Sequence, residues 1–154
     1  MRIFKVTLTG LVGSLIAALF FLGCGGGESL TKAEFIEQAD AICLKAEKEK
    51  QEDMEAFLLK SSAGSAQPLT LKEQLELATD AILPQLRFQA DELTSLAAPD
   101  GEEDQASTIV TEFGAVVSDL EKSPLPLAST QADPFTTVAE KARDYGFKTC
   151  ILNY

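Results

Sequence analysis

Apolar residues recur every three or four positions along four stretches of the chain, which is the spacing of one buried face of an α-helix. These stretches are residues 31–60, 70–98, 100–122 and about twelve residues from position 134. None of them alternates apolar and polar residues for long, as a strand with one buried face would. The connecting sequences "SSAGSAQP" and "SPLPLAST" contain glycine or proline, which interrupt a helical repeat. The pattern therefore predicts an all-α domain.

Each stretch begins with a residue pair that is typical of a helix N-terminus. The pairs are Thr31 with Glu34, Thr70 with Glu73, Asp100 with Glu103, and Asp133 with Pro134. The first two are capping boxes, in which each side chain accepts a hydrogen bond from the backbone N–H of the other residue. In the last, proline takes the first helical position, where no backbone N–H is needed. Pro84 lies inside the second stretch and is expected to kink or split that helix, because it removes a backbone hydrogen bond.

The helix lengths indicate how these pieces pack. At a rise of about 1.5 Å per residue, the first two helices are roughly 45 Å long, the third about 33 Å and the fourth about 18 Å. Short connections favour antiparallel neighbours, so we expect a small antiparallel bundle of about four helices with a short last helix. In such a bundle, Cys43 in the first helix and Cys150 near the C-terminus lie at matching heights if the fourth helix lies beside the first.

The N-terminus has the composition of an export signal. Arg2 and Lys5 precede residues 6–22, which contain no charge. This apolar run is at the short limit for spanning a bilayer, and glycine, serine and threonine dilute it, so cleavage is the favoured interpretation. Retention as an N-terminal transmembrane anchor is the alternative. Either interpretation places the rest of the chain outside the cytoplasmic membrane.

Gly23 and Cys24 follow the apolar run and resemble the cleavage site of bacterial lipoprotein precursors, although Phe21 and Leu22 stand where that family usually has leucine and a small residue. The resemblance implies a signal peptide over residues 1–23 and a lipidated Cys24, whose acyl chains, such as palmitate, anchor the protein in the bilayer. A glycine-rich tether over residues 24–30 and a helical domain over residues 31–154 would follow. A buried Cys24 is a further alternative.

The chain has an odd number of cysteines, and an exported chain with an odd thiol needs an explanation. If Cys24 carries lipid, Cys43 and Cys150 remain as a pair that an oxidising compartment allows to form a disulfide. Closing a loop of about 100 residues contributes roughly 4.7 kcal/mol in the chain-entropy account. Two buried free thiols are the alternative.

The segment "LTKAEFIEQADAIC", together with a late "YGFKTC", resembles a group of small helical envelope lipoproteins that carry one cysteine near each end of the mature chain. This resemblance also implies that Cys43 pairs with Cys150. It implies no substrate.

The net charge limits the partners. It is −11 for the whole chain, and it becomes −13 once Arg2 and Lys5 leave with the signal, since 11 basic side chains then stand against 24 acidic ones. A polyanion is not drawn by its charge to nucleic acid or to an anionic lipid surface. The acidic surface either attracts cationic partners or is simply solvated, and the net charge leaves both interpretations open.

The residue types give little support to catalysis or metal binding. The chain contains no histidine, which removes the usual general base and the commonest metal ligand. Carboxylates stand mostly in runs such as "EKEKQEDME", which is typical of a solvated helix face. The run that begins at Asp100 fails as a calcium loop, because Gln105 replaces glycine at its sixth position and Thr111 replaces glutamate at its twelfth. No catalytic residue, cofactor or metal site is predicted.

We therefore expect a membrane-anchored envelope lipoprotein whose helical domain binds or spaces other envelope components without catalysis. One alternative is a carrier or sensor that holds an apolar small molecule between its helices, although aromatic residues at helical spacing are more usually core. The aromatic residues concerned are Phe35, Phe57, Phe113, Phe135 and Tyr145. Another is a carboxylate-based hydrolase, which needs two acids facing each other across a cleft.

Overall fold

The computed structural model describes residues 29–61, 68–128 and 133–151. Its helical elements are α1 (Lys32–Ser61), α2 (Leu71–Leu77), the π-helical segment η1 (Ala78–Ile82), α3 (Leu83–Ser95), α4 (Glu103–Lys122), the 3-10 turn η2 (Leu125–Ala128) and α5 (Thr136–Tyr145). The segments α2, η1 and α3 follow one another without a break and form one long helix. The predicted all-α architecture is confirmed.

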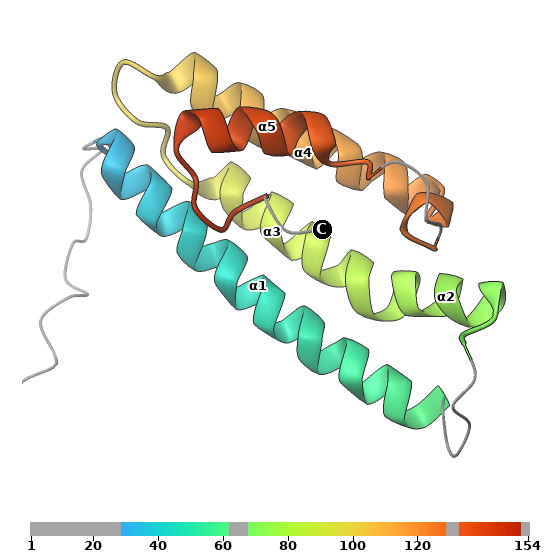
Figure 1. Ribbon diagram of the computed structural model, residues 1–154. Coiled ribbons are helices and arrows are strands. Elements are labelled where there is room, and N and C mark those ends of the chain that lie inside the picture. Colours follow the sequence, from blue (N-terminus) through green and yellow to red (C-terminus); the bar gives the residue numbers. More distant parts are fainter. Residues whose placement is uncertain (1–28, 62–67, 129–132, 152–154) are drawn as a thin grey trace, which may run out of the picture.

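The helices form an antiparallel bundle (Figure 1). The long helix packs along α1, α4 packs along α3, and the short α5 packs along α4. An isolated bridge between Leu30 and Pro99 joins the chain two residues before α1 to the residue before the turn that leads into α4. The prediction of about four antiparallel helices with a short last one is therefore confirmed.

The two predicted capping boxes fix the starts of α1 and α2. The Thr31 backbone N–H donates to Glu34 Oε2 at 2.9 Å, and the Glu34 N–H donates to Thr31 Oγ1 at 3.3 Å. Thr70 and Glu73 make the same reciprocal pair at 2.7 and 3.3 Å. Hydrogen bonds from the threonine hydroxyl and backbone lower the pKa of Glu34 and of Glu73, because they stabilise the ionised carboxylate.

The predicted cap at Asp100 is wrong. Helix α4 has Glu102 at its N-cap position, and no side chain caps it. Asp100 lies in the preceding turn with Gly101, whose φ is +77°. The Asp100 N–H donates to the Leu30 carbonyl at 3.1 Å, so a contact with a distant part of the chain holds this residue out of the helix.

The start of α5 also differs from the prediction. The Asp133 carboxylate accepts a hydrogen bond from the Phe135 N–H at 2.9 Å, which forms a turn over Pro134. Helix α5 begins after this turn, at Thr136. Pro134 therefore lies in the turn and is not the first helical residue.

Pro84 kinks the second helix and does not split it. Just before the proline the chain winds as a π-helix, and the Leu83 N–H donates to the Ala78 carbonyl five residues back. The wider turn lets the helix continue past a residue that has no N–H to donate. Figure 1 shows the axis changing direction between α2 and α3.

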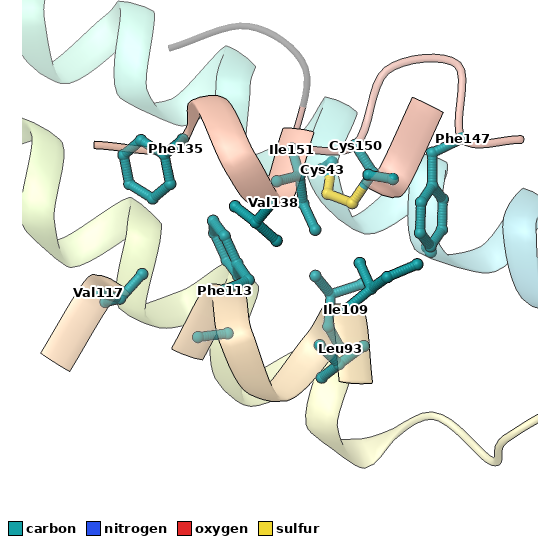
Figure 2. Packing of buried hydrophobic residues seen from close by; sticks show 14 of the residues in the cluster. Cys43, Leu93, Ile109, Phe113, Val117, Phe135, Val138, Phe147, Cys150 and Ile151 are labelled. Atoms are coloured by element: carbon teal, nitrogen blue, oxygen red, sulfur yellow. A yellow bond between two sulfur atoms is a disulfide. The ribbon is translucent and has the colours of Figure 1, made fainter. Parts of the chain in front are cut away.

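One hydrophobic core joins α1, α3, α4 and α5 (Figure 2). Four of the five aromatic residues expected from the pattern are buried in it, whereas Phe57 is half-buried. The buried four are Phe35, Phe113, Phe135 and Tyr145. In α1 the buried positions end at Ala46, so the second half of this helix lies outside the core.

Helix α5 ends at a glycine that its backbone conformation requires. Gly146 has φ +117°, its N–H donates to the Arg143 carbonyl at 3.0 Å, and the Phe147 N–H donates to the Ala142 carbonyl at 3.0 Å. This is a Schellman arrangement, which favours glycine because a Cβ is strained there. A Cβ at this position would also lie 3.3 Å from Ile36 Cδ1.

We expect Gly146→Ala to lower the free energy of unfolding by about 1–2 kcal/mol, because alanine is forced to a positive φ. The matched control is Gly114→Ala inside α4, where an added Cβ meets nothing within 4 Å. That variant should gain about 0.5–1 kcal/mol, since alanine is the better helix former. Urea unfolding of the disulfide-bonded protein, followed by circular dichroism, measures both. Equal changes in the two variants would contradict the role of Gly146.

Candidate functional site

Cys43 and Cys150 form a disulfide, as predicted. Their Cα atoms are 5.0 Å apart across a sequence separation of 107 residues. Both cysteines are buried, so the bond lies inside the fold. The alternative of two free thiols is wrong. Figure 2 shows the sulfur atoms inside the core, close to Ile151.

The route by which Cys150 reaches α1 differs from the one expected. Helix α5 packs along α4, and its last residue, Tyr145, meets Phe35 of α1 edge to face with ring centroids 6.2 Å apart. The chain then leaves the helix, and residues 146–151 cross to α1. The disulfide was therefore predicted correctly, but the expectation that the last helix lies beside α1 is wrong, because the crossing segment carries Cys150 to α1.

Asp40 holds the crossing segment on α1. Its carboxylate accepts hydrogen bonds from three successive backbone N–H groups, those of Lys148 at 3.1 Å, Thr149 at 3.0 Å and Cys150 at 2.9 Å. The Thr149 hydroxyl donates to the Asp40 carbonyl at 3.4 Å. Successive N–H groups that converge in a turn form a natural anion site, and here the protein's own carboxylate fills it.

Sequence reasoning missed Asp40. Its donors lie 108 to 110 positions later in the chain. They are backbone N–H groups, which do not depend on the type of side chain and therefore leave no pattern in the sequence. The one sequence signal is its place near the apolar face of the helix, next to Ala39 and three positions before Cys43.

A second cluster joins the start of α1, the residue before α4 and the end of α5. Lys32 Nζ lies 2.9 Å from Glu102 Oε2 and 4.2 Å from the centroid of the Tyr145 ring. Burial, and then the negative charge of Glu102, raise the pKa of Tyr145 to about 12. The ammonium group is thus shared between a carboxylate and an aromatic face, which ties three elements together at one end of the bundle.

The hollow that reaches the core at this end measures about 140 Å³ and is bordered by Phe35, Leu93 and Val110. Sites for drug-sized ligands usually measure about 300–1,000 Å³. This hollow therefore gives no support to a carrier of an apolar molecule. Among the described residues, no three histidine, cysteine, aspartate or glutamate side chains come together in a way that could hold a metal ion.

The predicted signal peptide and Cys24 lie outside the described residues. Within the described ranges, no helix has both the length and the apolar character needed to cross a membrane. Comparison with known protein families, curated proteins and solved structures finds no match to this chain. A functional assignment must therefore rest on its own residues.

We expect Asp40→Asn to lower the free energy of unfolding by roughly 1.5–3 kcal/mol, the range for hydrogen bonds to a charged group. The amide offers one acceptor oxygen and no charge to the three N–H donors. Asp91→Asn, at an exposed position of α3, removes the same charge as a control and should change stability by less than about 0.5 kcal/mol. Urea unfolding with the disulfide intact measures the difference. Equal effects of the two substitutions would show that the Asp40 contacts contribute nothing.

Tyr145 should make the fold sensitive to alkali. Its folded pKa is raised to about 12, above the ordinary value of 10.0, so its contribution to stability is complete below pH 10 and is lost as the pH rises towards 12. The variant Tyr145→Phe should lack this part of the pH dependence. Near-ultraviolet absorbance of tyrosinate, compared between protein and variant, gives the Tyr145 titration directly. A midpoint near 10 for that difference would contradict the assignment.

Proposed function

We propose that the protein is a membrane-anchored lipoprotein of the cell envelope, whose helical domain acts as a binding or structural module without catalysis. The observation that carries this proposal is the pairing of Cys43 with Cys150. It leaves Cys24 outside the disulfide, at the position where the resemblance to lipoprotein precursors puts the acylated residue.

The disulfide also supports export. Such bonds form and persist in oxidising compartments and are rare in the cytosol. In this chain it closes a loop over nearly the whole described domain and is buried in the core, so it belongs to the folded structure. A basic N-terminal flank followed by an uncharged apolar run provides the matching export signal.

The geometry of the tether suggests how the domain is oriented. Residues 24–30 reach at most about 25 Å when fully extended, and the chain enters the bundle at Leu30, whose carbonyl binds the Asp100 N–H. The salt bridge from Lys32 to Glu102 is a second contact that holds the start of α1 against the start of α4. In the proposed arrangement this end of the bundle faces the bilayer, and the far ends of α1 and α2 point away from it.

Intact-mass spectrometry of the membrane-extracted protein tests the proposal. We expect a chain that begins at Cys24 and carries a diacylglyceryl group, and that gains two hydrogen atoms on reduction as the Cys43–Cys150 bond opens. The variant Cys24→Ser should keep the disulfide and lose both the lipid and the cleavage. A chain that begins at Met1 without lipid would overturn the lipoprotein assignment and favour a retained anchor.

A further inference from the structure

The second half of α1 carries a surface hollow that lies outside the hydrophobic core and away from the tether. It measures about 350 Å³ and is lined by five residues of one face of the helix. These residues, which we call the distal groove, are Gln51, Met54, Glu55, Leu58 and Leu59. Their spacing of three and four positions makes the groove run along the helix axis.

The apolar side chains of the distal groove are open to solvent. Leu59 is 72% exposed and Leu58 is 38% exposed, whereas the last buried residue of α1 is Ala46. Figure 1 shows the reason: the second half of α1 lies beside α2 and η1, away from α4 and α5. Adjacent exposed leucines around a hollow are typical of an interaction surface, whereas single exposed leucines are ordinary.

Acidic residues outnumber basic ones in the segments that form this end of the bundle, and one of them, Glu55, lines the hollow. Residues 51–61 and 68–82 together contain six carboxylates and two lysines. The carboxylates are Glu52, Asp53, Glu55, Glu73, Glu76 and Asp80. Two of these carboxylates already have a lysine partner: Lys72 lies 3.4 Å from Glu76, and Lys48, three residues before Gln51, lies 3.7 Å from Glu52. The net formal charge of these two segments is therefore negative.

We propose that the distal groove docks a cationic amphipathic helix of a partner protein in the envelope. This inference specifies the partner of the proposed binding module and rests on that function. The apolar face of such a helix would bury Leu58 and Leu59, and its lysine or arginine residues would lie near Glu55. The ridges of one helix fit the grooves of another, so α1 offers a suitable surface for a helix.

The charge of the chain decides between this partner and a second copy of the same protein. A second copy without its signal peptide would bring another net charge of −13, because 11 basic side chains stand against 24 acidic ones. Like charges brought together in this way disfavour association, whereas a basic partner is attracted and correctly oriented. The occupant is therefore a basic helix.

The probe for the test is a synthetic helical peptide of leucine and lysine with all leucines on one face. A control peptide has the same composition in an order that gives no apolar face. Binding is measured by fluorescence anisotropy to the full chain, extracted from membranes and held in phosphatidylcholine nanodiscs, with empty nanodiscs as the blank. We expect the amphipathic peptide to bind at least about tenfold more tightly than the control peptide, a difference of about 1.4 kcal/mol.

Variants locate the binding on the protein. Leu58→Ser combined with Leu59→Ser should weaken binding about tenfold, whereas Leu125→Ser, at another exposed leucine in η2, should leave it unchanged. Glu55→Gln should weaken binding about threefold. Glu103→Gln removes the same charge at an exposed position at the start of α4 and should have no effect. Circular dichroism confirms that each variant folds.

Three outcomes would overturn the docking proposal. They are equal binding of the two peptides, equal weakening by Glu55→Gln and Glu103→Gln, and a concentration-dependent dimer that the leucine substitutions abolish. None of them bears on Cys24, because the lipid is detected by mass on the same preparation. A lipidated protein that ignores the peptide refutes only the docking site, and an unlipidated protein that binds it refutes only the lipoprotein assignment.

Discussion

The end of the bundle where α1 begins depends on one constraint, the attachment of residues 146–151 to α1. Helix α5 has ten residues and no side-chain cap at its N-terminus, so it is too short to be stable alone. The Asp40 carboxylate and the Cys43–Cys150 bond fix the segment that follows it. With that segment in place, Tyr145 and Phe147 pack on the Phe35 ring, with centroids 6.2 and 6.0 Å away.

The bundle is consequently built differently at its two ends. At one end, the Lys32–Glu102 ion pair, the Leu30–Pro99 bridge and the disulfide-linked segment connect the starts of α1 and α4 with the end of α5. At the other, α1 continues from Ala46 to Ser61 without a further buried residue. Cross-links between helices are therefore concentrated where the chain enters the domain, whereas the opposite end of α1 keeps exposed side chains such as Leu59.

Local sequence rules predicted the helices well where the local chain decides the structure. Periodicity placed the first helix at residues 31–60, and the structure has Lys32–Ser61, because the capping box is complete within four residues. The rules failed at Asp100, whose N–H binds Leu30, a partner 70 positions away. Of the candidate site, the cysteine pair could be predicted from the odd number of cysteines, whereas the helix-length argument assumed a last helix beside α1 and that helix packs along α4. Asp40 could not be predicted, because its partners are backbone groups brought close only by the finished fold.

The disulfide also changes the covalent topology of the molecule. Because it links positions 107 residues apart, the backbone from Cys43 to Cys150 is a closed ring that contains most of α1 and all of the later helices. A protease that cuts once inside this ring yields two fragments that stay joined, so the nicked domain keeps its mass until a reductant separates the pieces. A single break inside this ring therefore leaves the domain as one covalently connected molecule.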